Sequence, residues 1–339
     1  MDKLYDNSDL LEVKDLRTYF YQDSGVLKAV DGVTFNLKKG KTLGIVGESG
    51  CGKSVTALSI IRIVLPGGKL EGGSILLRLN SSENKSQVFE LGKMHPKGES
   101  IRKIRGKEIS MVFQEPMTSF SPVHTIGNQI MEAMLLHNSI SIKDARKYAL
   151  EMLNKVGISN PIERLESYPH QLSGGMRQRA MMAMALSCNP SLLIADEPTT
   201  ALDVTIQAQI MYLLKDLQSK SGMSILYITH DLGVIAELAD HVAVMYLGKI
   251  VEYTNVDKLF HDPRHPYTMA LLKAIPNFAK SRKEKLSSIK GRVPLPVDLP
   301  KACGFHQRCP HMIKGRCDVL EPELSKINGE HEVRCFLYS

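Results

Sequence analysis

The segment at residues 47–54, Gly-Glu-Ser-Gly-Cys-Gly-Lys-Ser, constrains this chain more than any other feature. It fits the pattern G-x-x-x-x-G-K-[ST] between an apolar run at 42–46, which predicts a buried strand, and a segment at 55–63, which predicts a helix. Glycines let successive backbone N–H groups point at phosphate oxygens near the positive end of a helix dipole. Lys53 adds a mobile positive charge, and the Ser54 hydroxyl can ligate Mg²⁺. The predicted nucleoside triphosphate contacts are Gly47, Glu48, Ser49, Gly50, Cys51, Gly52, Lys53 and Ser54.

A second apolar run, at 192–195, ends in two carboxylates, Asp196 and Glu197. An aspartate at the end of a buried strand, level with a phosphate-binding loop, is placed to hold Mg²⁺ through water. The adjacent Glu197 can orient and deprotonate an attacking water. The alternative is that Asp-Glu-Pro simply ends a strand. The segment at 172–179, which precedes these carboxylates by few residues, argues against that alternative.

That segment has the sequence Leu-Ser-Gly-Gly-Met-Arg-Gln-Arg and begins a predicted helix that runs to about Leu186. Ser-Gly-Gly alone is an ordinary turn sequence, so its weight comes from its place before the carboxylates. Together the motifs resemble those of ATP-binding cassette (ABC) proteins, with Met176 where glutamine is more common. In that family the segment caps the γ-phosphate bound to the partner subunit. The resemblance implies this role in trans for Ser173, Gly174 and Gly175.

The same resemblance gives roles to three further residues. Gln114 ends a predicted strand at 109–113 and matches the glutamine that senses Mg²⁺ and the attacking water. His230 follows a predicted strand at 224–229 and matches the histidine that contacts the γ-phosphate. Asp203, after Thr-Ala-Leu, matches the loop that crosses the dimer interface. We thus expect catalysis from Glu197, His230 and Gln114, and Mg²⁺ binding from Ser54, Gln114 and Asp196.

ABC proteins also stack the adenine on an aromatic residue shortly before the phosphate-binding loop. This chain offers Tyr19, Phe20 and Tyr21 in a row. Alternate side chains of a strand face opposite ways, so Phe20 points away from its two neighbours. Counting back from the apolar residues at 26–30 favours Phe20 or Tyr21, and the sequence leaves both open.

The composition indicates a globular enzyme. A length of 339 residues suggests about two domains, and an apolar share of 43% is ample for a core. No apolar stretch approaches the roughly 20 residues that span a bilayer. The net charge of +7, without a concentrated basic tract, is compatible with an anionic membrane surface, and we expect no nucleic-acid partner.

Patterning along the chain predicts the fold. Residues 11–36 alternate as in an antiparallel hairpin, 115–175 have helical spacing, and 191–239 alternate strands with helices. We expect an α/β, ABC-type P-loop ATPase with a RecA-like core, an antiparallel β subdomain, a helical subdomain and a small cysteine-rich C-terminal extension. The predicted division is a nucleotide-binding domain at 1–259 and an extension at 260–339.

The proline-rich tail carries four of the six cysteines, spaced C-x5-C-x7-C-x17-C. In a cytosolic chain, clustered cysteines bind metal more often than they form disulfides, and four thiolates suit Zn²⁺ or an iron–sulfur cluster. So short a region buries little core, and a metal would stabilise it. Free thiols are the alternative. The predicted metal ligands are Cys303, Cys309, Cys317 and Cys335.

Longer stretches, at 44–54, 112–119 and 169–176, resemble ATPase subunits of oligopeptide/dipeptide ABC importers, and the tail sequence at 265–268, His-Pro-Tyr-Thr, is typical of that subfamily. The resemblance implies ATP and Mg²⁺ as substrate and cofactor, and a 4Fe–4S cluster in the tail with Zn²⁺ as the alternative. It implies a heterodimer with a sister ABC ATPase, two transmembrane permease subunits and an extracytoplasmic peptide-binding protein. The chain would then lie peripherally at the cytoplasmic face of the membrane.

A rival interpretation is a soluble ABC-type ATPase of DNA repair with a four-cysteine metal module. Such chains contain long coiled coils or two cassettes in one polypeptide. This chain has one compact cassette with a short interval between Gln114 and Ser173, which favours the importer.

Overall fold

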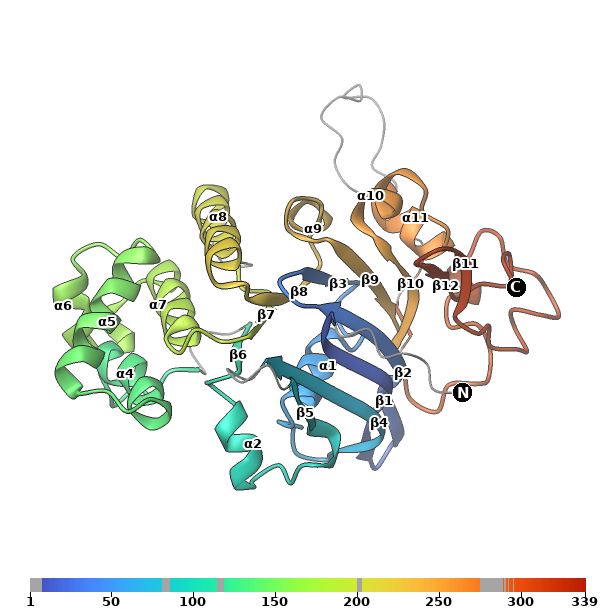
Figure 1. Cartoon of the computed structure of the whole chain (residues 1–339). Coiled ribbons are helices and arrows are strands. Elements are labelled where there is room, and N and C mark those ends of the chain that lie inside the picture. The colour runs from blue at the N-terminus through green and yellow to red at the C-terminus, as the bar shows by residue number, and fades with distance from the viewer. Residues whose placement is uncertain are drawn as a thin grey trace.

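The computed structural model describes residues 8–80, 86–114, 119–199, 203–274 and 296–339, together with positions 289, 291, 293 and 294 (Figure 1). Within these residues the strands form two sheets. The larger sheet has the order β11-β12-β10-β9-β3-β8-β7-β6. Its strands are β3 (Thr42–Val46), β6 (Ile109–Val112), β7 (Leu192–Asp196), β8 (Ser224–Thr229), β9 (His241–Tyr246), β10 (Lys249–Asn255), β11 (Ser325–Asn328) and β12 (His331–Val333).

The centre of this sheet is parallel and buried on both faces, which confirms the predicted α/β core. Strand β3 pairs in parallel with β8 and β9, and β7 pairs in parallel with β6 and β8. Successive side chains of one strand enter different cores, as strand geometry requires. In β8, Ile225 and Tyr227 pack in one core, and Leu226 and Ile228 pack in the other.

The smaller sheet has the order β2-β1-β4-β5 and is antiparallel throughout. It confirms the predicted hairpin and the antiparallel β subdomain. Its apolar side chains share a core with one face of the larger sheet and with the helix that follows the phosphate-binding loop. The strands are β1 (Asp9–Gln22), β2 (Gly25–Lys38), β4 (Gly68–Asn80) and β5 (Ser86–Glu90).

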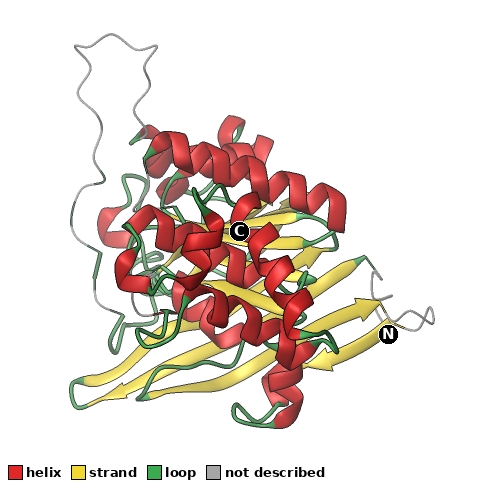
Figure 2. Ribbon diagram, turned by 90° about the vertical axis from the view of Figure 1, so that its left-hand side faces the viewer, coloured by secondary structure: helices red, strands yellow, loops and turns green. Residues whose placement is uncertain are grey.

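Helices α4 to α7 gather at one end of the molecule, opposite the C-terminal segment (Figure 1). Figure 2 views the molecule from that helical end, with the long strands of the antiparallel sheet along its lower edge. The α-helices are α1 (Lys53–Ile60), α2 (Glu99–Ile104), α4 (Ile126–His137), α5 (Ile142–Lys155), α6 (Pro161–Glu166), α7 (Gly174–Leu186), α8 (Val204–Ser221), α9 (Leu232–Leu238), α10 (Val256–His261) and α11 (Pro266–Lys273). Short 3₁₀ helices are η1 (Leu91–Lys93), η2 (Pro169–Gln171) and η3 (His306–Arg308).

Helix α5 illustrates how local sequence builds this end. The side chain of Ser141 caps the helix by accepting a hydrogen bond from the Asp144 N–H. Small and apolar residues at three-and-four spacing then form one buried stripe against α4 and α7. The buried residues are Ala145, Ala149, Met152 and Leu153.

The C-terminal segment extends the large sheet and does not form a separate layer. Strand β12 pairs with β10, and β11 pairs with β12. Further along the molecule the segment crosses β2, where the Lys28 N–H donates to the Pro296 carbonyl at 3.0 Å and Leu27 forms a bridge with Val297. Backbone pairing therefore holds this short, proline-rich segment against the cassette at two places. In the described part of the chain, no helix is long and apolar enough to cross a bilayer.

The start of α11 contains a buried histidine whose protonation should affect stability. His265 is 1% exposed, and its side chain accepts from the Tyr267 N–H. Burial lowers the pKa of His265 to about 4. The Glu252 carboxylate and a hydrogen bond with the Arg334 backbone oppose this shift in the pKa, and the Arg334 guanidinium adds to it. Because the unfolded chain takes up this proton near pH 6.5 and the folded chain does not, the free energy of unfolding falls as the pH drops below about 6.5.

We expect a loss of about 2 kcal/mol between pH 7 and pH 5 from this residue. The change His265→Asn keeps a capping acceptor without the titrating ring and should flatten the pH dependence, whereas the exposed His311→Asn should leave it unchanged. Urea unfolding at both pH values measures the effect. Equal pH dependence in wild type and His265→Asn would show that His265 does not carry it.

Candidate nucleotide site

The phosphate-binding loop joins β3 to α1 and lies tightly against two neighbouring backbones. Gly47 has φ 157° and Gly52 has φ 102°. A Cβ atom on Gly47 would lie 2.3 Å from the Met245 carbonyl oxygen, and one on Gly52 would lie 2.1 Å from the Ala29 carbonyl oxygen. These two positions therefore require glycine, both for the backbone angle and for the space.

Lys53, the first residue of α1, folds back into this loop. Its side chain is buried, and its ammonium donates to the carbonyl oxygens of Gly47 at 2.8 Å and Glu48 at 3.1 Å. A buried ammonium group needs hydrogen-bond partners, and here the carbonyl oxygens of the loop itself are those partners. The charge is thus held at the mouth of the loop, where phosphate oxygens can replace those partners.

The end of β7 places Asp196 beside this loop. Asp196 is 3% exposed, and the Ser54 hydroxyl hydrogen-bonds to its carboxylate. Burial raises the pKa of Asp196, and the nearby Glu197 charge adds to this, while Ser54 and Lys53 lower it. Its Oδ1 atom is buried without a hydrogen-bond partner. A hydroxyl beside a buried carboxylate, one oxygen of which has no hydrogen-bond partner, fits a hard divalent cation, so Ser54 and Asp196 are suited to hold Mg²⁺.

The three predicted catalytic side chains lie together. Gln114 Nε2 donates to Glu197 Oε2 at 3.1 Å, and His230 Nδ1 lies 3.1 Å from Glu197 Oε1. Glu197 is 9% exposed, whereas the His230 side chain is 57% exposed. The end of β7 therefore brings this carboxylate into contact with both other predicted catalytic side chains.

Glu197 also has a left-handed backbone, with φ 47°, and its N–H donates to the Ile228 carbonyl at 2.8 Å. A non-glycine residue in this region costs roughly 1–3 kcal/mol and persists only where its surroundings fix it. The backbone bond to β8 is one such constraint, and it aims the carboxylate out of the strand end toward His230.

A cavity of about 480 Å³ opens in front of the loop. Of the two candidate adenine contacts, Phe20 and Tyr21, one lines this cavity and the other does not. Phe20 lines this cavity together with Lys53, Gln114 and Glu197. Tyr21 does not line it: its hydroxyl donates to Glu71 Oε1 at 2.8 Å, and its side chain is largely exposed.

The predicted signature residues lie outside this cavity. Ser173 is exposed and caps α7 by accepting from the Met176 N–H, and Gly174 is also exposed. Asp203 caps α8 by accepting from the Ile206 N–H at 3.0 Å. Neither segment contributes to the lining of the cavity, and positions 200–202 before Asp203 lie outside the described residues.

Among the cavity and loop contacts that were not predicted from the sequence, three come from residues beyond position 260. Pro296 lines the cavity, although it lies in the C-terminal segment. Arg308 pairs with the Glu48 carboxylate, and the Tyr267 hydroxyl accepts from the Glu48 N–H. Tyr267 belongs to the sequence His-Pro-Tyr-Thr, which is typical of the peptide-importer subfamily, and this motif was the one signal in the sequence that could have indicated its role. Nothing in the sequence pointed to Pro296 or Arg308.

A phosphate-binding loop facing paired carboxylates on a neighbouring parallel strand, with a glutamine and a histidine at adjacent strand ends, defines an ATPase cassette of the ABC class. The family model for the ABC transporter matches residues 30–200, and that for the oligopeptide/dipeptide transporter C-terminal region matches residues 251–317. The chain belongs to the ABC transporter family, in the branch of the oligopeptide/dipeptide transport ATP-binding proteins, and is an ATP hydrolase.

Relatives are similar over nearly the whole chain. The oligopeptide transport ATP-binding protein AppD of Bacillus subtilis is 51% identical over 98% of this chain and 97% of its own length. The dipeptide transport ATP-binding protein DppD of Escherichia coli is 46% identical over 96% of each. Among solved structures, the dimeric ATP-binding cassette MJ0796 with ADP and Pi has a TM-score of 0.63 at 26% identity, covering 73% of this chain and 98% of that one.

The predicted 4Fe–4S cluster, and with it the zinc alternative, is wrong. Across the described residues, which include all four tail cysteines, no three His, Cys, Asp or Glu side chains are placed to hold a metal ion. Cys303 and Cys317 pack in the same apolar core as Phe305, and burial raises the pKa of the Cys303 thiol to about 11. The relatives are named as oligopeptide and dipeptide transport ATP-binding proteins, and these names mention no cluster. Cys303 and Cys317 act as small apolar residues, so packing takes the place of a metal.

The two aromatic neighbours in β1 allow a matched test of the adenine contact. If Phe20 stacks on the base, Phe20→Ala should raise the dissociation constant for ATP about 5-fold to 150-fold, since base–aromatic stacking contributes about 1–3 kcal/mol. Tyr21→Ala should leave it within about twofold, because that side chain does not line the cavity. Fluorescence titration with ATP measures both constants. The assignment of Phe20 fails if Tyr21→Ala has the larger effect.

Proposed function

We propose that this chain is the ATP-hydrolysing subunit that powers import of dipeptides and oligopeptides through a membrane ABC permease. The observation that carries the catalytic part is the contact of Glu197 with both Gln114 and His230 in front of the phosphate-binding loop. The transported substrate is inferred from the relatives, whose names specify oligopeptide and dipeptide transport at 46–51% identity.

In this proposal Glu197 is the general base for the attacking water. A proton passes from the water to the Glu197 carboxylate, while Gln114 and His230 fix the position of that carboxylate. Lys53 holds the terminal phosphates by charge, and Ser54 and Asp196 would hold Mg²⁺, which neutralises charge on the phosphate oxygens when bound. Phe20 stacks on the adenine from β1.

The active site is completed by a second cassette. Ser173, Gly174 and Gly175 start α7 on the surface, outside the cavity that contains Lys53 and Glu197. A helix N-terminus is a good phosphate ligand, but within one chain this one does not line the cavity. The related cassette with ADP and Pi is dimeric, which supports a head-to-tail pair. The proposed partner is a sister ABC ATPase, with Asp203 at the interface.

One contact offers a route from hydrolysis to the helical end. Gln178 of α7 is 2% exposed, and its Nε2 donates to the Pro198 carbonyl at 2.5 Å. Pro198 is the residue that directly follows Glu197 in the chain. We propose that α7 moves with this loop and passes the motion through the helical subdomain, at about 115–175, to two permease subunits. The nucleotide-binding domain is then 1–259, and 260–339 is an extension of it.

The proposed location is the cytoplasmic face of the cell membrane, where the chain would bind the permease. Through the permease it would act together with a peptide-binding protein on the other side of the membrane. The DNA-repair interpretation is not favoured, because peptide-transport relatives match nearly the full length of the chain and its four-cysteine metal module is not formed.

Two substitutions should separate binding from hydrolysis. Glu197→Gln should leave the ATP dissociation constant nearly unchanged and lower turnover by about 10²–10⁴-fold, because it removes the base and spares the phosphate contacts. Lys53→Ala should weaken ATP binding itself. Nucleotide titration and phosphate release, measured with the sister subunit present, report the two effects. The exposed Glu163→Gln on α6 is the matched control and should change neither. Near wild-type turnover in Glu197→Gln would exclude it as the base.

The transport role is tested in cells. A strain that lacks this chain should lose uptake of a radiolabelled dipeptide or pentapeptide supplied as the sole source of a required amino acid. Expression of the wild type should restore uptake, and Glu197→Gln should not. Normal uptake in the deletion strain, combined with sensitivity to DNA damage, would favour the rival interpretation.

A further inference from the structure

The C-terminal segment reaches across the molecule and binds one residue of the phosphate-binding loop. The Arg308 guanidinium pairs with the Glu48 carboxylate through two bonds, Nη1 to Oε2 at 2.7 Å and Nη2 to Oε1 at 2.9 Å. The two residues are 260 positions apart in the chain. A bidentate arginine–carboxylate pair is geometrically specific as well as charge-assisted, so it fixes the Glu48 side chain in direction and distance.

Arg308 is itself held rigidly. Its side chain is only 5% exposed, and Nη1 also donates to the Tyr246 hydroxyl at 3.2 Å. The guanidinium lies 5.7 Å from the centre of the Tyr246 ring and 5.9 Å from that of Phe305. The hydrogen bonds to Glu48 raise the pKa of Arg308, so the guanidinium stays charged. Little conformational entropy remains to be lost when this arginine meets the loop.

A second contact comes from α11. The Glu48 N–H donates to the Tyr267 hydroxyl at 2.9 Å, and the Tyr267 side chain is fully buried. Tyr267 packs at 4.7 Å, centre to centre, on the Tyr246 ring and at 5.4 Å on Phe305. Tyr246, Tyr267 and Phe305 thus form one aromatic cluster. Tyr267 belongs to this cluster, and Arg308 packs against it, so both residues that contact Glu48 are held by the same cluster.

The remaining backbone group of Glu48 points to the lysine of the loop, since its carbonyl oxygen accepts from Lys53 Nζ at 3.1 Å. The N–H and the carboxylate of Glu48 are thus bound by residues beyond position 260, and its carbonyl is bound by Lys53. A displacement of Glu48 would therefore move its carbonyl oxygen, which is a hydrogen-bond partner of the Lys53 ammonium. This ammonium is the charge proposed to bind phosphate.

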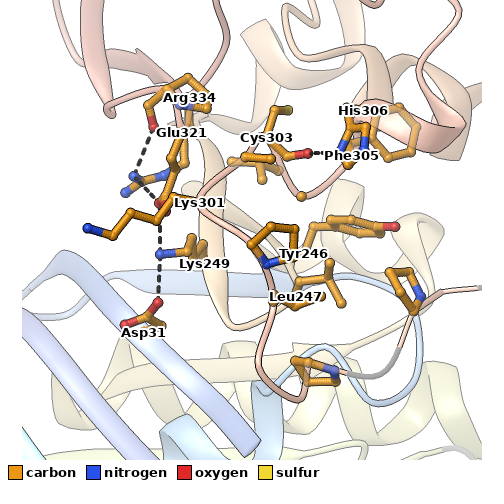
Figure 3. A pocket seen from close by; sticks show the side chains of 18 of the residues that line it. Asp31, Tyr246, Leu247, Lys249, Lys301, Cys303, Phe305, His306, Glu321 and Arg334 are labelled. Atoms are coloured by element: carbon orange, nitrogen blue, oxygen red, sulfur yellow. Dashed lines mark hydrogen bonds and ion pairs between the residues drawn. The ribbon is translucent and has the colours of Figure 1, made fainter. Parts of the chain in front are cut away.

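The region that carries these contacts is anchored to the cassette. Lys249 on β10 bridges Asp31 of β2 and Glu321 of the C-terminal segment, with both ion pairs at 2.8 Å. Arg334 lies 3.6 Å from Glu321 in the same chain of charges, as Figure 3 shows. This network lines one side of a cavity of about 130 Å³, and Tyr246 and Phe305 line it as well. The aromatic cluster is therefore held between the sheet and the C-terminal segment.

From these contacts we infer that Arg308 and Tyr267 are positioning residues for the phosphate-binding loop, so that the C-terminal segment sets the affinity for ATP. A glycine-rich loop loses much conformational freedom on binding, and fixing it beforehand lowers that cost. Arg308 also neutralises Glu48, whose carboxylate would otherwise repel the triphosphate. This inference rests on the proposed ATP site. It adds to that site a part of the chain that is remote in sequence.

The test is ATP affinity in the full-length protein with its sister subunit. Arg308→Ala should raise the ATP dissociation constant about tenfold, since it leaves a partly buried carboxylate unpaired beside the loop. Adding Glu48→Gln to it should restore part of the loss, because the repelling charge is removed as well. Tyr267→Phe keeps the ring and should weaken ATP binding about threefold to tenfold, through loss of one hydrogen bond to the loop. The exposed Arg316→Ala, in the same segment, should have no effect.

Hydrogen–deuterium exchange distinguishes positioning from general destabilisation. In Arg308→Ala and Tyr267→Phe, exchange should accelerate in the peptide that covers residues 44–54 and stay unchanged in strands β7 and β8. Unchanged ATP affinity in both variants, while Lys53→Ala loses binding, would overturn this inference and leave the ATP site standing. Wild-type protein that does not bind ATP would overturn both.

Discussion

The parallel hydrogen-bonded order β3-β8-β7-β6 is the constraint on which the rest of the molecule depends. Each of these strands ends at the same edge of the sheet, and each is followed by one part of the site. The phosphate-binding loop follows β3, His230 follows β8, Glu197 follows β7 and Gln114 follows β6. Open parallel sheets bind ligands at the carboxyl ends of their strands because loop ends and helix N-termini gather there. The register of four strands thus brings together residues from four distant parts of the chain.

The C-terminal segment depends on the same sheet. It is short and proline-rich, and alone it could bury little apolar surface. Strand β12 adds to β10, residues near Pro296 pair with β2, and Phe305 packs on Tyr246 and Tyr267. In this position Arg308 and Tyr267 reach Glu48 of the phosphate-binding loop. An extension that looks separate in sequence is therefore continuous with the nucleotide site in space.

The tail also explains why one sequence-based expectation failed. Four cysteines in a region with few apolar residues indicate a metal when the region is considered as an isolated unit. In the fold it is not isolated, because Cys303 and Cys317 complete a core supplied mainly by the cassette. Composition cannot reveal a core whose other half lies in distant parts of the chain. Strands, helices and their order were predictable because hydrophobic periodicity is a local property.

The sequence by itself determined the strand–loop–helix around Lys53, the carboxylates that end β7 and the antiparallel β subdomain, since glycine spacing, apolar runs and alternation act over a few neighbouring residues. The tertiary structure decided which of two adjacent aromatic residues, Phe20 or Tyr21, lines the cavity, because that depends on which face of β1 meets the loop. It also decided that the Arg308 guanidinium forms an ion pair with the Glu48 carboxylate. A pair so distant in the chain is brought into contact only by the packing of the whole molecule, which no local pattern encodes.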